Sequence, residues 1–371
     1  MTDPSKVYFT DLHTRTGHSL LDKFDLLMKK TGIEKIDFKN KFTAIKLHFG
    51  EPGNLAFIRP NFAARVVRQV RALGGKPYLT DCNTMYFGER GNAVDHLQTA
   101  MENGFNYLST GAQVIIADGL TGGDTEEIPI NLKHVKNAKV GMALAQADVV
   151  ISLTHFKGHD ATGFGGALKN VGMGGGSRKG KLEMHAASKP TIREDECVAC
   201  GTCIKYCPQH AIAYNRNHKA QIDYNLCIGC GQCIASCHYG AVHGHYDENA
   251  VALNEKIAEY AYAILKDKPH FHISLIMNVS PNCDCWDYND MAIVPDIGMA
   301  ASFDPVSLDC ACAELVNQAV VIPGSVLEEK KWKPGEDKFN MLFPNTRWQD
   351  CVRHAEEIGL GSQKFELVQI K

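Results

Sequence analysis

Eight cysteines in two groups of identical spacing constrain this chain more than any other feature. Each group reads C-x2-C-x2-C-x3-C, the spacing that holds [4Fe–4S] clusters. The first three cysteines of a group can wrap three corners of a cube of iron and sulfide, whereas the fourth starts the following helix and points toward a second cube. We therefore predict two [4Fe–4S] clusters, one bound by Cys197, Cys200, Cys203 and Cys237 and the other by Cys227, Cys230, Cys233 and Cys207.

Two other uses of these cysteines fit the sequence less well. A zinc site needs only four ligands, whereas this stretch holds eight, with Gly201, Gly229 and Gly231 placed where backbone must pass close to sulfide. A disulfide framework requires an oxidising compartment, and residues 1–12 show no signal-peptide pattern.

The cysteine-containing segment 191–246 resembles ferredoxin-type 2[4Fe–4S] domains. One departure is that Pro208 follows the last cysteine of the first group, whereas His238 follows that of the second. The loss of this proline alters the exit turn but removes no ligand.

Apart from its cysteines, the chain has the length, charge and hydrophobicity of an ordinary globular protein. Its 371 residues suffice for two or three domains. A net charge of −3 gives no reason to expect nucleic acid or an acidic membrane surface as a partner, and no apolar stretch approaches the length of a membrane span. Together with reduced cysteines, these features predict a cytoplasmic protein, and the oxygen sensitivity of exposed clusters indicates an anaerobic host.

Strand-like and helical patterns alternate on both sides of the cysteine groups. Residues 147–154 form a nearly continuous apolar run, as in a buried parallel strand. Asp304 and Pro305 are an N-cap and a first-turn proline for a helix to about residue 320. The other predicted elements are strands at 43–49, 76–80, 113–117, 270–278 and 365–370 and helices at 60–73 and 248–265.

This alternation predicts a layered α/β body with a mainly parallel sheet. The pattern stops near Lys189 and resumes near Glu248. We therefore expect an α/β body in two parts, 1–190 and 247–371, with an α+β ferredoxin-like 2[4Fe–4S] domain, 191–246, inserted between them.

A glycine-rich, basic segment follows the predicted strand 147–154. No acidic residue lies between Asp160 and Glu183, and ligand crevices of α/β sheets lie outside the carboxyl ends of strands. We predict a site for a carboxylate or phosphate, with a helix N-terminus at Gly163–Gly166 as part of it. The predicted proton donors or acceptors are His155, His159 and His185, and the predicted anion-binding residues are Lys157, Lys169, Arg178 and Lys181.

The alternative for this segment is a mobile loop with solvated lysines. A P-loop is rejected, because Leu182 stands where the pattern G-x4-G-K-[ST] requires a hydroxyl, and no strand immediately precedes the loop.

Cys283 and Cys285 flank Asp284 in an irregular stretch after a predicted strand. Two thiols at this spacing can share a metal ion or form a redox pair, and a purely structural role is equally open. Four further cysteines are expected to be buried as small hydrophobic residues, namely Cys82, Cys310, Cys312 and Cys351. Cys310 and Cys312 fall in one predicted helix, where residues two apart do not face each other.

Short motifs along the chain resemble those of the DUF362 family over nearly its whole length. The motifs are K-L-H-F-G-E-P-G-N at 46–54, I-R-P at 58–60, T-D-C-N-T at 80–84, N-A-V-D-H-L at 92–97, H-F-K-G-H at 155–159, G-F-G-G-A-L-K-N at 163–170, C-D-C at 283–285 and P-D-I-G-M-A-A-S-F-D-P-V at 295–306. The resemblance implies an iron–sulfur protein, many members carrying the same ferredoxin insertion, but it implies no reaction. Cys82 departs from the usual threonine of its motif. A more distant similarity to lactate racemase-type proteins supplies no residue roles.

These features predict an iron–sulfur redox protein in which two clusters exchange electrons with an anionic small molecule or cofactor bound in the α/β body. One alternative is an electron carrier whose basic loop docks an acidic redox partner. Another is a metal- or cluster-assembly protein that transfers its cargo through Cys283 and Cys285. A pocket between the glycine-rich loop and the clusters favours the first hypothesis, an exposed convex basic loop the second, and a metal ion on Cys283 and Cys285 the third.

Overall fold

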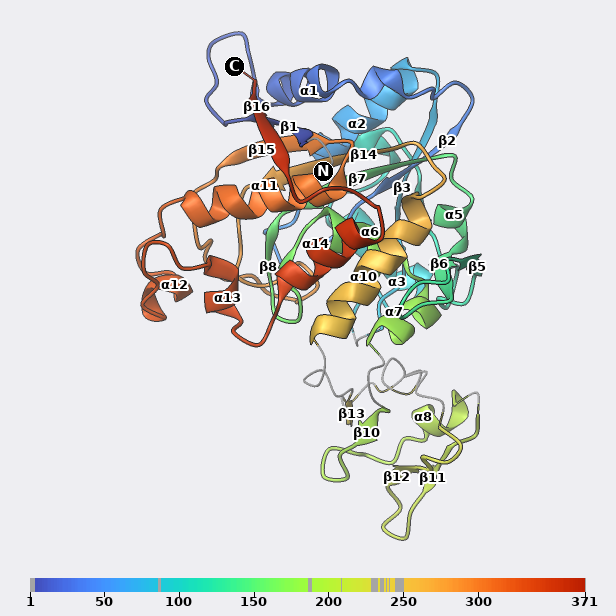
Figure 1. Ribbon diagram of the computed structural model, residues 1–371. Coiled ribbons are helices and arrows are strands. Elements are labelled where there is room, and N and C mark those ends of the chain that lie inside the picture. Colours follow the sequence, from blue (N-terminus) through green and yellow to red (C-terminus); the bar gives the residue numbers. More distant parts are fainter. Residues whose placement is uncertain are drawn as a thin grey trace.

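The computed structural model describes residues 4–85, 88–185, 189–207, 209–227, 233, 237, 239, 241–243 and 250–370. Its centre is an eight-stranded sheet with the order β16-β1-β15-β14-β7-β2-β3-β4 (Figure 1). The strands span Ser5–Thr10 (β1), Phe42–Lys46 (β2), Lys76–Asp81 (β3), Val114–Ile116 (β4), Val149–His155 (β7), His270–Ile276 (β14), Gly298–Ser302 (β15) and Phe365–Gln369 (β16). All neighbours are parallel except that β15 runs antiparallel to both β1 and β14.

The predicted mainly parallel α/β sheet is confirmed, and its predicted strands correspond to β2, β3, β4, β7, β14 and β16. The strands β1 and β15 were not predicted. In β15 the sequence G-M-A-A-S is fully buried and made mostly of small residues, so it carries neither the alternation nor the β-branched residues that mark a strand.

Helices cover both faces of the sheet (Figure 1). On one face lie α1 (Leu20–Thr31) and α2 (Pro60–Ala72), which form a core with Ile151 and Leu153 of β7. The other face carries α6 (Ala167–Gly175), α10 (Ala250–Leu265), α11 (Pro305–Gln318) and α14 (Trp348–Glu357). Val150 of β7 joins the core on this second face. Since successive side chains of a strand point to opposite faces, β7 is apolar throughout.

The helix predicted at 248–265 corresponds to α10, most of whose residues are buried, and α6 and α14 pack against it. The remaining elements of the body are η1 (Ile33–Lys35), α3 (Ala93–Glu102), α4 (Tyr107–Thr110), β5 (Thr125–Pro129), β6 (Asn137–Gly141), α5 (Met142–Ala145), β8 (Lys157–His159), β9 (Gly163–Gly165), α7 (Arg178–His185), α12 (Val326–Glu329) and α13 (Lys338–Leu342). None of the helices in the described ranges is long and apolar enough to cross a membrane.

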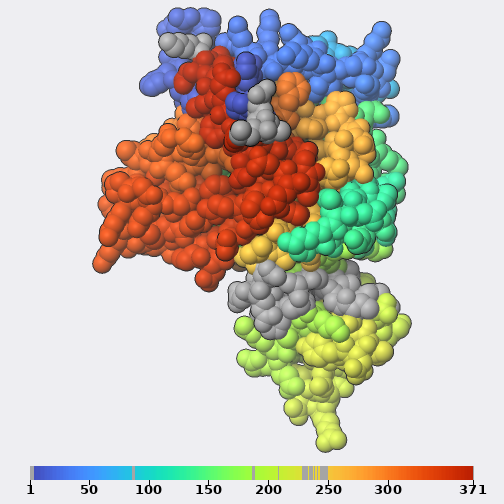
Figure 2. Space-filling view, in the orientation of Figure 1, coloured from blue at the N-terminus to red at the C-terminus, as the bar shows by residue number. Residues whose placement is uncertain are grey.

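The segment between α7 and α10 forms small strand pairs of its own. The strand β10 (Thr191–Ile192) pairs with β13 (Val242–His243), so the two ends of the segment meet. Between them lie α8 (Thr202–Lys205) and a hairpin of β11 (Ile212–Tyr214) and β12 (Ala220–Ile222). These strands do not join the eight-stranded sheet. Figures 1 and 2 show the segment projecting from the end of the body where α7 and the start of α10 lie.

Candidate functional site

The candidate site lies at the carboxyl ends of the parallel strands. Lys46, Asp81 and His155 are the last residues of β2, β3 and β7, and the loop after β14 carries Cys283–Cys285. Parallel strands bring such residues to one edge of the sheet, which is where α/β folds form ligand crevices.

Asp284 anchors the loop after β14. Its buried carboxylate lies 2.8 Å from Nδ1 of His155 and 3.2 Å from Nζ of Lys157. Burial raises the pKa of Asp284, but His155 and Lys157 outweigh this effect and hold it below its usual value. Asp284 was not assigned a role from the sequence, although it is the central residue of the C-D-C motif.

His155 and Lys157 are engaged by this anchor rather than directed at a ligand. The other ring nitrogen of His155, Nε2, lies 2.9 Å from the carbonyl oxygen of Met277. Lys157 also donates to the carbonyl oxygen of His155 at 3.0 Å. Both ring nitrogens of His155 thus lie beside oxygen atoms of the protein, and Lys157 is paired with Asp284. The roles of His155 in proton transfer and of Lys157 in anion binding stay predictions.

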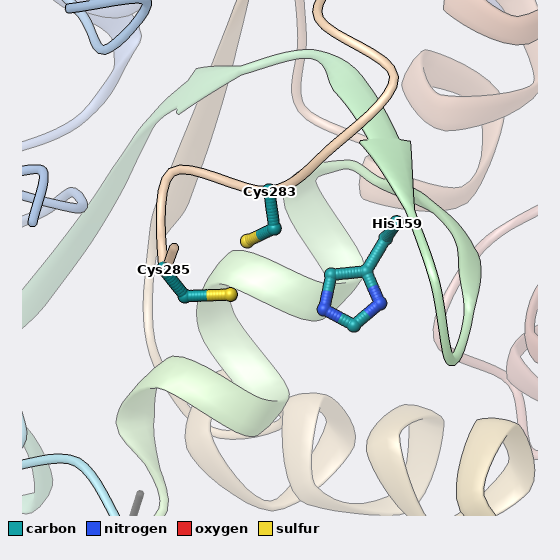
Figure 3. Close-up of side chains that lie close together, drawn as sticks. All are labelled: His159, Cys283 and Cys285. Atoms are coloured by element: carbon teal, nitrogen blue, oxygen red, sulfur yellow. The ribbon is translucent and has the colours of Figure 1, made fainter. Parts of the chain in front are cut away.

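His159, Cys283 and Cys285 form a compact group beside this anchor. One ring nitrogen of His159 and the two sulfur atoms all lie within 4.8 Å of one another. Figure 3 shows the two sulfur atoms and the imidazole ring directed into the same space. The group therefore gathers one predicted site histidine with both cysteines of the C-D-C motif, and its donor set is compatible with metal binding.

Lys169 adds a cation to this group. Its Nζ lies 3.5 Å from Sγ of Cys283. A hydrogen bond from Cys285 lowers the pKa of Cys283 well below that of an ordinary thiol. Burial raises this pKa, but Lys169 and His159 also lower it, so the net shift is downward. The same hydrogen bond raises the pKa of Cys285, so the two cysteines share one negative charge.

Two of the predicted anion-binding residues donate hydrogen bonds to backbone oxygens, namely Arg178 and Lys181. Arg178 donates to the carbonyl oxygens of Thr84 at 3.1 Å and Thr121 at 3.0 Å. Lys181 donates to the carbonyl oxygen of Gly176 at 2.7 Å. Both side chains therefore tie α7 to its surroundings. The segment is not the mobile loop of the alternative interpretation, since it is built into β8, β9, α6 and α7.

His185, the last residue of α7, is close to the cysteine and histidine group. Burial, His159 and Lys169 together lower the pKa of His185 to about 4. Lys169 also lines a pocket of about 250 Å³ with Asp309, Asn254 and Trp348. Of the predicted catalytic and anion-binding residues, the structure thus brings together His159, His185 and Lys169.

The N-terminus of α6 does not offer the predicted anion site, because the protein fills it. The carboxylate of Asp309 accepts hydrogen bonds from the backbone N–H groups of Ala167 at 2.7 Å and Leu168 at 3.0 Å. A Cβ atom at Gly166 would overlap this carboxylate. The glycine therefore admits the carboxyl group of Asp309, which occupies the position that was predicted for an external anion.

A buried ion-pair network underlies the same edge of the sheet. Asp81 lies 2.9 Å from Nζ of Lys46 and 3.3 Å from Arg90, which in turn lies 2.7 Å from Glu51. Burial raises the pKa of Asp81, but Lys46 and its other cationic neighbours outweigh this and lower it. These residues received no role from the sequence, although Lys46 lies within a predicted strand and Asp81 directly follows one, both in motifs that resemble those of the DUF362 family.

The four cysteines that are assigned to the first cluster meet in one place. Cys197, Cys200, Cys203 and Cys237 line a pocket of about 340 Å³, partly open to solvent. Burial raises the pKa of Cys203, and the neighbouring Cys237 raises it further. No disulfide forms among the cysteines that the structure describes.

The cysteines that are assigned to the second cluster are described in part. Cys207, Cys227 and Cys233 pack into the same small core as those of the first cluster. Sγ of Cys207 accepts a hydrogen bond from the N–H group of Ala211 at 3.3 Å. Cys230 lies outside the described residues. Of the four cysteines expected to be buried, Cys82, Cys312 and Cys351 are buried and Cys310 is half-buried.

A family model described as a domain of unknown function, DUF362, matches residues 43–314. The chain belongs to the DUF362 family. No curated protein matches it in sequence.

Two solved structures are similar to this DUF362 chain. The lactate racemase apoprotein from Thermoanaerobacterium thermosaccharolyticum is 13% identical, with a TM-score of 0.43 over 85% of this chain and 58% of its own. A structural-genomics target from Thermotoga maritima is 12% identical, with a TM-score of 0.43 over 83% of this chain and 61% of its own. The chain thus spans about three fifths of the length of either protein.

Proposed function

We propose that this protein is an iron–sulfur redox protein whose two [4Fe–4S] clusters exchange electrons with an anionic small molecule bound in the α/β body. The observation that carries the proposal is the common pocket of Cys197, Cys200, Cys203 and Cys237. These cysteines come from both groups, and sequence spacing alone assigns them to one cube.

The environment of the cysteines supports this use. The core of the segment 191–243 contains several free cysteines among few apolar side chains, and closely packed thiolates need a cationic centre to balance their charge. The N–H group of Ala211 donates a hydrogen bond to the sulfur of Cys207. Hydrogen bonds of this kind to cluster sulfurs adjust the reduction potential of the cluster. Cys227, Cys230, Cys233 and Cys207 would hold the second cluster. When bound, such clusters accept and release electrons one at a time.

Lys169 is the best-placed group for an anionic molecule in the body. It is half-buried, reaches the sulfur of Cys283, and lines the 250 Å³ pocket. Most other cations of the basic segment are buried or bonded to backbone oxygens. This arrangement favours an enclosed site over an exposed basic loop that docks a redox partner.

Metal and sulfide analysis of anaerobically purified protein tests the clusters. We expect about eight iron and eight sulfide per chain, because each of two cubes contains four of each. About one zinc ion with negligible sulfide would overturn the proposal.

Calorimetry with small carboxylates and phosphates tests the body site. The Lys169→Ala variant should bind such ligands roughly ten- to a hundredfold more weakly, because a charge-assisted hydrogen bond contributes about 1.5–3 kcal/mol. Lys179→Ala is the matched control, since Lys179 is an exposed cation of the same segment. Equal effects of both changes, together with slower electron exchange with an acidic partner at high salt, would favour the electron carrier instead.

A further inference from the structure

We propose that His159, Cys283 and Cys285 bind one soft divalent metal ion of the zinc type, at a site distinct from the cysteines of segment 191–246. Two thiolates and one imidazole are a donor set typical of zinc sites that keep a fourth position open. The three donor atoms lie within 4.8 Å of one another. Around a tetrahedral zinc ion two sulfur ligands are about 3.8 Å apart, so shifts of about 1 Å suffice to close the site.

The backbone of the C-D-C loop places both sulfurs on one side. Cys283 to Trp286 form a turn, closed by the N–H group of Trp286, which donates to the carbonyl oxygen of Cys283 at 3.1 Å. Asp284, the intervening residue, is held by His155 and Lys157, and its carbonyl oxygen accepts the N–H group of Glu51 at 3.1 Å. This anchoring fixes the loop, so the sulfurs of Cys283 and Cys285 are directed toward His159 before any ion binds (Figure 3).

His159 is oriented by groups around its Nδ1 atom. The carboxylate of Asp160 lies 3.3 Å from Nδ1, and the N–H groups of Ala161 and Thr162 lie 3.1 and 3.2 Å from it. Both N–H groups donate to Nδ1, which is therefore an acceptor. These contacts fix the ring so that Nε2 faces the sulfurs of Cys283 and Cys285 (Figure 3).

The surrounding charges define what the fourth position would bind. A divalent ion with two thiolates is neutral, Lys157 is paired with Asp284, and Lys169 adds a positive charge 3.5 Å from Cys283. An anionic oxygen ligand, such as a carboxylate, a phosphate or hydroxide, therefore suits the open position.

Cobalt titration tests this site in the intact, reduced chain. Cobalt(II) takes the same ligands as zinc, and thiolate coordination gives it an intense near-ultraviolet charge-transfer absorption. We expect one equivalent of cobalt to produce this absorption and zinc to displace it. The Cys283→Ser/Cys285→Ser double variant should lose it, whereas Cys312→Ser, which changes a buried cysteine on α11 outside the site, should keep it.

The intact chain and the Cys283→Ser/Cys285→Ser variant differ only in the C-D-C loop. A difference between their cobalt absorptions therefore tests the metal site independently of the iron and sulfide analysis. Identical cobalt spectra for the two proteins would overturn the metal site even if both clusters are present. Thiol counting that finds a disulfide between Cys283 and Cys285 under reducing conditions would also overturn it. An undiminished cobalt absorption in His159→Gln would remove His159 from the ligand set and leave too few ligands for the proposed site.

Discussion

The carboxylate of Asp309 caps the N-terminus of α6 by accepting the N–H group of Ala167 at 2.7 Å. The two residues are 142 positions apart in the chain, so the cap joins α11 to the segment that carries Lys169. A carboxyl group at this position accepts hydrogen bonds from backbone N–H groups that have no partner within the helix.

This cap predicts a pH-dependent stability. Burial raises the pKa of Asp309 from 3.8 to about 7, although hydrogen bonds from Leu168 and Ala167 oppose the shift. Because the folded state then holds the proton more tightly than the unfolded state, the contribution of Asp309 is greatest below about pH 4 and is lost as the pH rises through 7. Unfolding followed by circular dichroism between pH 5 and 8 should show a steeper decline for the natural chain than for Asp309→Asn. Parallel curves would show that Asp309 is ionised throughout.

The network around Asp81 predicts a large loss of stability on its removal. Asp81→Ala leaves Lys46 and Arg90 buried without their shared partner, and breaking a buried ion pair in this way costs about 3–5 kcal/mol. Asp37→Ala is the control, because Asp37 is 71% exposed where it pairs with Lys41, and exposed ion pairs contribute little to stability. Urea unfolding measures both values. A small effect of Asp81→Ala would mean that water reaches the network.

The assignment of cysteines to cubes predicts a pattern in paired variants. Cys200 and Cys237 line the same pocket, so the combination Cys200→Ala/Cys237→Ala should lose no more iron than either single change. Cys200→Ala/Cys207→Ala should lose nearly all iron, because its two residues are assigned to different cubes. Iron content and electron paramagnetic resonance of the reduced protein give the result. The opposite pattern would exchange the two fourth ligands.

The pairing of Thr191 with His243 predicts that the body tolerates removal of the cysteine-containing segment. Because the ends of the segment meet, a short Gly/Ser linker in place of 191–246 should span them at little entropic cost. We expect a folded body with unchanged protease resistance, and cobalt binding that still depends on Cys283 and Cys285. An unfolded product would show that the body requires the segment.

The sequence predicted those parts of the fold that depend on local patterns. Periodicity and terminal signals located β2, β3, β7, β14 and their helices, because buried parallel strands are long apolar runs. They missed β15, where small residues fit between β14 and β1 without a strand-like pattern. Register and neighbours in a sheet are set by distant parts of the chain, so no local pattern reveals them.

In the candidate site, too, local patterns identified residues, whereas contacts with distant parts of the chain could not be predicted. Residue types and strand ends identified His159, Lys169, Cys283 and Cys285 as candidates, and the structure places them together. The sequence could not show that other cations of the basic segment already have partners. Arg178, for example, donates to carbonyl oxygens more than 50 residues away, and backbone oxygens have no signature in a sequence.

The ladder between β10 and β13 has a consequence for folding kinetics. The neighbouring strands β7 and β14 are separated in the chain by residues 156–269, and their pairing must close this long loop. Once Thr191 and His243 have paired, the loop that remains is shortened roughly by half, which reduces its closure entropy by about 0.6 kcal/mol. Pairing of β10 with β13 thus favours early pairing of β7 with β14 in the centre of the sheet. Metal binding to the segment 191–243 would therefore accelerate folding of the α/β body, although no strand of the segment belongs to the eight-stranded sheet.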